Sequence, residues 1–115
     1  MSLRIYHNPR CSKSRQTLAL LQEHGHTPEI VEYLTSPPTA GELAVVLGML
    51  GLGPRDAMRK GEAVFKELNL GNDSLTNEQL IDAMVANPIL IERPIVITAS
   101  KAAIGRPPES VLDIL

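Results

Sequence analysis

The feature that most constrains the fold is a strand, a helix and a second strand within the first 34 residues. Apolar residues alternate over 3–6, before Asn8-Pro9, and predict a short strand. A helical pattern covers 11–24, and Gly25 is suited to end it. Residues 29–34 are rich in Ile, Val and Tyr and predict the second strand. Because one helix connects the two strands, they are expected to lie parallel in a βαβ unit.

The middle of the chain is predicted to be helical. Thr39 with Glu42, and Thr76 with Gln79, have the spacing of capping boxes. The first capped helix is expected to end at Gly51. The predicted helices, in order, run from Thr39 to Gly51, over 55–60, over 62–68, and from Thr76 to Asn87-Pro88.

The C-terminal part is predicted to contain two strands and a helix. The strands cover 94–98 and 102–105, with a turn at Ser100-Lys101, and the helix covers 109–115. The full order indicates an α/β chain with a thioredoxin-like fold. Its mixed four-stranded sheet carries a helical insertion after the second strand, and residues 1–115 are expected to form a single domain.

Composition excludes several classes of protein. With 43% apolar residues the chain is globular, and its net charge of −2 gives no overall basic surface for nucleic acid. The longest nearly unbroken apolar run, 43–52, is too short to cross a bilayer, so no membrane association is expected. No export signal is visible, which predicts a cytoplasmic protein. His24 and His26 lack further ligands, and no metal site is expected.

The chain has one cysteine, Cys11, which excludes an internal disulfide and a self-contained dithiol cycle. It is placed where a strand ends and a helix begins, close in sequence to His7 and to the cations Arg10, Lys13 and Arg15. Free backbone N–H groups and the helix dipole favour a thiolate there. The same N–H groups can hold the oxygens of an anion. The segment therefore predicts a nucleophile combined with an oxyanion cradle, rather than a buried structural cysteine.

Ser14 occupies the position of the second cysteine in a C-x-x-C motif. Its hydroxyl can donate a hydrogen bond to the Cys11 thiolate, but it cannot form a disulfide. An ordinary role as a first-turn helix residue is the alternative interpretation.

Several segments together resemble the glutaredoxin-linked arsenate reductase family, and they span nearly the whole chain. Ser12-Lys13 stands where other members carry Gly-Thr, which indicates a Ser-Lys variant subgroup. The matching segments are Tyr6-His7-Asn8-Pro9-x-Cys11, Ser14-Arg15, Thr17-Leu18, Tyr33-Leu34, Pro37-Pro38, Arg59-Lys60, Glu67-Leu68-Asn69-Leu70, Asn87-Pro88-Ile89-Leu90-Ile91, Arg93-Pro94-Ile95-Val96, Arg106-Pro107 and Val111-Leu112-Asp113-Ile114-Leu115.

The resemblance implies a role for each matching site residue. Cys11 is the nucleophile, His7 helps to lower its pKa, and Ser14 hydrogen-bonds to the thiolate. The oxyanion ligands and the proline beside the site, which the resemblance expects to follow a cis peptide bond, are Arg59, Arg93, Arg106 and Pro94.

The resemblance also implies the reaction and its participants. Cys11 attacks arsenate or a similar oxyanion, glutathione attacks the resulting adduct as co-substrate, and glutaredoxin resolves the mixed species, with no bound cofactor. Two alternatives remain open. The first is a general glutaredoxin-like thiol oxidoreductase, for which three arginines are more than the task needs. The second is a non-catalytic regulator resembling the Spx proteins, although those sensors usually carry C-x-x-C.

Overall fold

The computed structural model describes residues 3–115, which fold as two compact units. The first unit combines the N-terminal part up to Ser36 with Arg93–Leu115, and the second unit is Pro37–Glu92. The expectation of a single domain over residues 1–115 stays a prediction. Among residues 3–115, no helix is long and apolar enough to cross a membrane.

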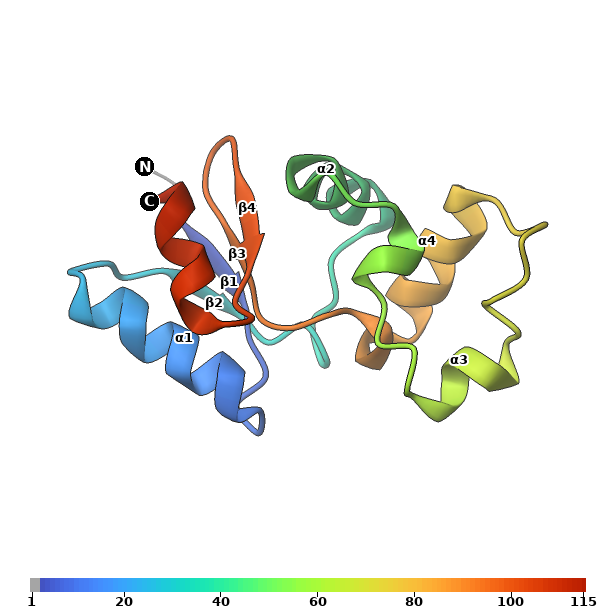
Figure 1. Cartoon of the computed structure of the whole chain (residues 1–115), viewed down its shortest axis with the longest axis horizontal. Helices are drawn as coiled ribbons and strands as arrows, with labels where there is room; N and C mark the ends of the chain where they lie inside the picture. The colour runs from blue at the N-terminus through green and yellow to red at the C-terminus, as the bar shows by residue number, and fades with distance from the viewer. Residues whose placement is uncertain (1–2) are drawn as a thin grey trace. The chain divides into compact units, whose positions relative to one another are not determined.

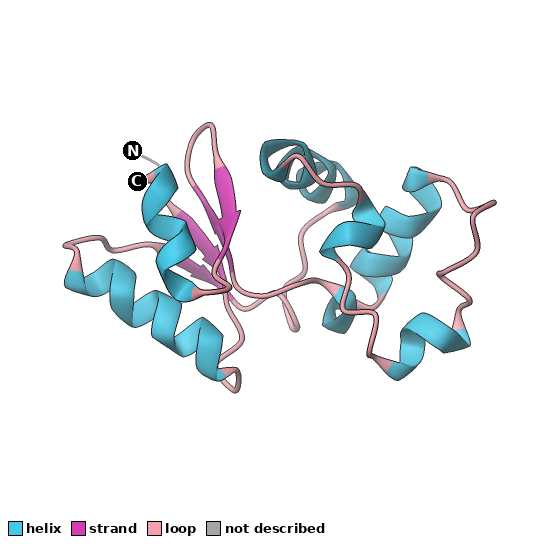
Figure 2. Cartoon of the chain, viewed as in Figure 1, coloured by secondary structure: helices cyan, strands magenta, loops and turns pink. Residues whose placement is uncertain are grey.

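The first unit contains a four-stranded sheet with the order β2-β1-β3-β4, drawn in magenta in Figure 2. Its strands are β1 (Arg4–Tyr6), β2 (Glu29–Val31), β3 (Ile95–Ile97) and β4 (Ala102–Ile104). β1 pairs parallel with β2, and the β1–β3 and β3–β4 pairs are antiparallel. The predicted mixed sheet and the parallel βαβ unit are therefore confirmed.

Two helices lie side by side along one face of this sheet, α1 (Ser12–Glu23) and η3 (Pro108–Ile114), as Figure 1 shows. They close the core of the first unit, whose central cluster is aliphatic, while the two tyrosines, Tyr6 and Tyr33, are also buried in this unit. This packing holds α1 and η3 against the sheet and fixes the start of α1 next to the end of β1. The central core residues are Ile5, Leu21, Val96 and Val111.

One prediction in the first unit is wrong in detail. The second strand, predicted over 29–34, ends at Val31, because the backbone N–H groups of Thr35 and Ser36 both donate to the carbonyl of Glu32 and close a turn. The helix predicted over 109–115 is present as the 3₁₀ helix Pro108–Ile114. Gly25 has a φ of +82°, so the predicted end of α1 is confirmed.

The second unit is the predicted helical insertion between β2 and β3. It contains α2 (Ala40–Leu50), η1 (Pro54–Ala57), α3 (Ala63–Glu67), α4 (Asn77–Ala86) and η2 (Pro88–Leu90). Both predicted capping boxes are present, at Thr39 with Glu42 and at Thr76 with Gln79. Gly51 ends α2 in the left-handed conformation, as expected.

The helix predicted over 55–60 is wrong in length, because η1 ends at Ala57. Beyond it the backbone is extended and pairs with the segment after η2. Met58 forms a β-bridge with Ile91, and the N–H of Arg59 donates to the carbonyl of Leu90 over 2.7 Å. These bonds to a distant segment replace the intrahelical bonds that a longer helix would have formed.

Candidate active site

Cys11 is the N-cap residue of α1, in the loop that leaves β1. Its backbone is extended, with φ −94° and ψ 123°, while its carbonyl already accepts the first helical bond from Arg15 N–H at 3.0 Å. Its own N–H donates to the carbonyl of Asn8 at 3.0 Å, which closes the loop. The residue is 8% exposed. The sulfur is thus held where the helix presents unpaired N–H groups.

The balance of effects on Cys11 favours the thiolate. Burial raises the pKa of the thiol, but hydrogen bonding from the Ser14 backbone N–H, from the Arg93 side chain and from the Lys13 backbone N–H lowers it, as does the charge of Arg93. The net result is a pKa below the ordinary value of a cysteine. The side chain of Cys11 does not make an N-cap hydrogen bond like the one that Thr39 accepts from the Glu42 N–H in α2. The amide dipoles at the start of α1 nevertheless stabilise negative charge on the sulfur.

Arg93 and Arg106 come from the two ends of the β3–β4 hairpin and meet at Cys11. The Arg106 Nη2 group donates toward Cys11 Sγ over 3.8 Å, and its Nε donates to the carbonyl of Arg93 over 2.7 Å. Arg93 bonds to the same sulfur through its side chain. Two of the three arginines expected at the site are therefore gathered around the thiol.

Close packing at the base of the hairpin positions Arg106. The Gly105 N–H donates to the carbonyl of Pro94 over 2.9 Å. A Cβ at Gly105 would lie 2.5 Å from Thr17 Oγ1 and 2.8 Å from Pro94 Cγ, so only glycine fits there without displacement. The Arg93–Pro94 peptide bond is cis, in agreement with the resemblance, and so is Arg106–Pro107, which no residue pattern predicted.

His7 and Ser14 form a buried polar pair beneath the loop. His7 Nδ1 lies 2.6 Å from Ser14 Oγ, and the backbone N–H of Asn8 donates to the same hydroxyl oxygen over 3.0 Å. Burial lowers the pKa of His7 and Arg15 lowers it further, against an opposite effect of Glu32, so the imidazole is biased toward its neutral form.

This arrangement differs in one respect from what the resemblance implies. The Ser14 hydroxyl lies against His7 and Asn8, and it is the Ser14 backbone N–H that lowers the pKa of Cys11. The hydroxyl therefore positions the loop that carries the nucleophile. The direct roles expected for His7 and Ser14 at the thiolate stay predictions.

Arg59, the third expected oxyanion ligand, belongs to the second unit. Its Nη1 forms an ion pair of 2.7 Å with Glu62 Oε2, and both side chains are about one-quarter exposed. Its role in oxyanion binding stays a prediction.

The cations nearest to Cys11 in the sequence act elsewhere. Arg15 Nη1 donates to the carbonyl of Pro9 over 3.0 Å, and Arg10 is exposed. The cation that lowers the thiol pKa is the distant Arg93. Within residues 3–115, no group of three or more His, Cys, Asp or Glu side chains could hold a metal ion.

Sequence reasoning assigned no role to two residues that shape the site. Thr17 is buried, and its hydroxyl donates to the carbonyl of Lys13 over 2.8 Å, in the turn whose N–H groups face the sulfur. Gly105 leaves the space that Thr17 and Pro94 occupy. The available signals were the position of Thr17 in a segment that matches the family and the position of Gly105 directly before an expected site arginine.

Comparisons with known proteins agree with this geometry. The family model described as the ArsC family matches residues 6–114. The uncharacterized protein YfgD of Escherichia coli (strain K12) is 56% identical, covering 98% of this chain and 96% of its own. An arsenate reductase of Rhizobium meliloti (strain 1021) is 46% identical, covering 100% of this chain and 82% of its own.

A solved structure supports the same relationship. An arsenate reductase from Vibrio cholerae has a TM-score of 0.96 and 51% identity, and covers 100% of this chain and 98% of its own. That similarity over the whole length confirms the predicted thioredoxin-like fold. With the family match and relatives such as these, the chain belongs to the ArsC family.

Proposed function

We propose that this protein is an arsenate reductase in which Cys11 is the nucleophile. The observation that carries the proposal is the arrangement around one sulfur. Cys11 Sγ lies at the start of α1 with a lowered pKa, and guanidinium groups of Arg93 and Arg106 bond to it. Similar proteins bearing the name arsenate reductase, at 46% and 51% identity, support the choice of oxyanion.

The first step joins the sulfur to arsenic. The Cys11 thiolate attacks the arsenic of dihydrogen arsenate, an S–As bond forms, and one arsenate oxygen takes up a proton and leaves as water. Arsenic stays pentavalent in this step. A lowered thiol pKa increases the fraction of thiolate available for the attack at neutral pH.

Arginines are needed because nucleophile and substrate are both anions. Arsenate resembles phosphate, which carries roughly −1.5 to −2 charges near neutral pH. At 4 Å and an effective dielectric of 20, each pair of like unit charges costs about 4 kcal/mol. Arginine stays charged and offers a planar pair of donors to tetrahedral oxyanions. Arg93 and Arg106 are placed to offset this repulsion, and we assign Arg59 to the same task.

The reduction requires thiols from outside the chain. The sequence has one cysteine, so Cys11 cannot form an internal disulfide to supply the two electrons. We infer that glutathione attacks the arsenic of the adduct and displaces a second hydroxyl as water, and that the glutaredoxin thiolate then attacks the glutathione sulfur. A glutathione–glutaredoxin disulfide forms, the electron pair of the broken bond between arsenic and the glutathione sulfur reduces arsenic to the trivalent state, and water hydrolyses the remaining Cys11–arsenic bond to release arsenite and the Cys11 thiolate. No bound cofactor takes part. A cytoplasmic location fits this scheme, because thiols remain reduced there.

A coupled assay tests the proposal. The purified protein is incubated with arsenate, glutathione, glutaredoxin, glutathione reductase and NADPH, and NADPH oxidation is followed. Activity that depends on arsenate and disappears in Cys11→Ser is expected. Equal activity in Cys11→Ser would refute the assignment. Turnover of a glutathione mixed disulfide with no turnover of arsenate would instead identify the general thiol oxidoreductase, and co-purification of RNA polymerase without either activity would indicate the regulator.

A further inference from the structure

The loop that leads into Cys11 is a β-turn over residues 8–11. The backbone N–H of Cys11 donates to the carbonyl of Asn8 over 3.0 Å, which is the bond that closes such a turn. The middle peptide of the turn, between Pro9 and Arg10, is held at both ends by side chains. Its N–H, from Arg10, donates to Asn8 Oδ1 over 3.0 Å. Its carbonyl, from Pro9, accepts a hydrogen bond from Arg15 Nη1 over 3.0 Å.

Asn8 takes part in three of the hydrogen bonds that shape this loop. Its backbone carbonyl accepts from Cys11, and its side-chain oxygen accepts from Arg10. Its backbone N–H donates to Ser14 Oγ over 3.0 Å. Asparagine is suited to this position, because its short side-chain carbonyl reaches the N–H two residues further along the chain. A single half-buried residue thus connects the end of β1, the turn and the first turn of α1.

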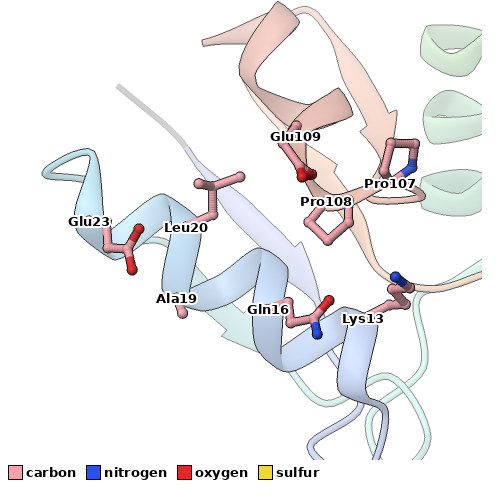
Figure 3. A pocket seen from close by; sticks show the side chains of 8 residues that line it. All are labelled: Lys13, Gln16, Ala19, Leu20, Glu23, Pro107, Pro108 and Glu109. Atoms are coloured by element: carbon pink, nitrogen blue, oxygen red, sulfur yellow. The ribbon is translucent and has the colours of Figure 1, made fainter.

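The geometry of this turn decides where the sulfur lies, because Cys11 is both the last residue of the turn and the N-cap residue of α1. The backbone N–H groups of Lys13 and Ser14, in the first turn of the helix, lower the pKa of the thiol. Figure 3 shows the Lys13 side chain extending toward Pro107, where it lines a groove between α1 and η3. Lys13 therefore acts on Cys11 through its backbone, and a rotation of the turn would move Sγ away from these N–H groups.

We propose that Asn8 is a positioning residue, whose side-chain oxygen holds the turn so that Cys11 Sγ stays in front of the first turn of α1. This role rests on the proposed function only where Cys11 serves as the nucleophile. Asn8→Ala removes the bond to the Arg10 N–H and leaves both backbone bonds of Asn8 in place. The middle peptide of the turn then retains only the bond from Arg15, and its freedom to rotate spreads the sulfur over more positions.

Alkylation of Cys11 by iodoacetamide tests this role without arsenate. The pH dependence of the rate gives the thiol pKa, and the plateau at high pH gives the reactivity of the thiolate itself. Asn8→Ala should raise the thiol pKa, so that alkylation near pH 6 slows by about two- to tenfold, the range that corresponds to one net hydrogen bond. The plateau should be no lower than in the wild type. Asn8→Ser, whose hydroxyl oxygen can accept from the same N–H, should have a thiol pKa between those of Asn8→Ala and the wild type.

Asn72→Ala is the matched control, because Asn72 makes the same kind of turn in the second unit. Its Oδ1 accepts a hydrogen bond from the backbone N–H of Ser74 over 3.0 Å, the distance found between Asn8 and Arg10. Both alanine variants should lower the urea midpoint of unfolding, since each loses a turn-closing bond. Only Asn8→Ala should move the pKa of Cys11, which separates a positioning role from a merely stabilising one.

An unchanged thiol pKa in Asn8→Ala, or an equal rise in Asn72→Ala, would overturn the role of Asn8. A rise in Asn8→Ser as large as in Asn8→Ala would overturn it too, because the acceptor oxygen would then have no effect. The coupled arsenate assay reports separately on the proposed function. A protein that reduces no arsenate but shows these pKa shifts retains the role of Asn8 and loses the proposed function. A protein that reduces arsenate with the same thiol pKa in every variant retains the function and loses the role of Asn8.

Discussion

The hydroxyl of Ser14 lies 2.6 Å from Nδ1 of His7, and both side chains are buried. This contact joins the first turn of α1 to the end of β1. Because the backbone N–H of Ser14 lowers the pKa of Cys11, the same residue links the buried histidine to the ionisation of the thiol. The pair therefore connects the stability of the loop with the reactivity of the cysteine.

Ser14→Ala should destabilise the protein by about 1–3 kcal/mol, because His7 and the Asn8 N–H each lose a hydrogen-bond partner in a buried or half-buried place. Urea unfolding measures the change. Ser12→Ala, at an exposed position of the same turn, is the control and should stay within about 0.5 kcal/mol of the wild type. Equal stability of the two variants would remove the structural role of the Ser14 hydroxyl.

Stability should fall as the pH is lowered, in part through His7. Its pKa is lowered in the folded protein, chiefly by burial, so below its unfolded pKa of about 6.5 the unfolded state binds more protons. The contribution of His7 is present above that value and is lost as pH falls through 6.5 toward the folded pKa. His7→Asn should reduce the slope of unfolding free energy against pH between about 7 and 5. Identical slopes in the wild type and in His7→Asn would contradict the contribution of His7 to the pH dependence of stability. An NMR titration that places the pKa of His7 above its ordinary value would contradict it as well.

Arg93→Met should raise the pKa of Cys11, since Arg93 contributes both a hydrogen bond and a positive charge to the sulfur. A hydrogen bond to a charged group contributes about 1.5–3 kcal/mol, so alkylation by iodoacetamide near pH 6 should slow by about tenfold or more. Arg10→Met, at an exposed position close to Cys11 in the sequence, serves as the control and should react much like the wild type. If alkylation slowed more in Arg10→Met than in Arg93→Met, the cation that chiefly lowers the thiol pKa would be Arg10, in the loop before α1.

Local patterns in the sequence were sufficient to predict most of the fold. The capping boxes at Thr39 and Thr76 are made by neighbours in the chain, and both form as predicted. The predicted second strand was too long because Tyr33, a residue common in strands, is buried within the turn that begins at Glu32 instead. Its burial comes from tertiary packing, which strand propensity does not report.

The site was predictable only where it is local. The position of Cys11 at a helix start follows from the adjacent residues, but the nearby Arg10 and Arg15 do not lower its pKa. The guanidinium beside the sulfur comes from Arg106, 95 residues away in the chain. Residue patterns alone could not pair positions so far apart, and the resemblance to a family was needed to select Arg93 and Arg106.

Gly105→Ala should destabilise the protein by about 1–3 kcal/mol, the usual cost of overpacking. Its new Cβ would meet Thr17 Oγ1 at 2.5 Å and Pro94 Cγ at 2.8 Å. Gly48→Ala is the matched control, because Gly48 lies within α2 with open space around it, and alanine should stabilise the helix there by about 0.5–1 kcal/mol. Denaturant unfolding measures both, and equal changes of the same sign would contradict the packing argument.

The ion pair between Arg59 and Glu62 allows a test of whether Arg59 binds arsenate, which the assay of the Cys11→Ser variant does not address. If Arg59 binds arsenate, Glu62 competes with the substrate for the guanidinium across their 2.7 Å ion pair. Glu62→Gln should therefore lower the KM for arsenate. The pair is partly exposed, and such pairs contribute about 0.2–1 kcal/mol, which limits the gain to at most about fivefold.

Arg59→Lys should act in the opposite direction and raise the KM for arsenate, because lysine lacks the planar pair of donors. Steady-state kinetics with arsenate varied at saturating glutathione measures both effects, and the KM for glutathione in the same variants is the internal control. A KM for arsenate that neither substitution moves would remove Arg59 from oxyanion binding. A shift in the same direction for both variants would show that the ion pair acts on the folding of the second unit rather than on the substrate.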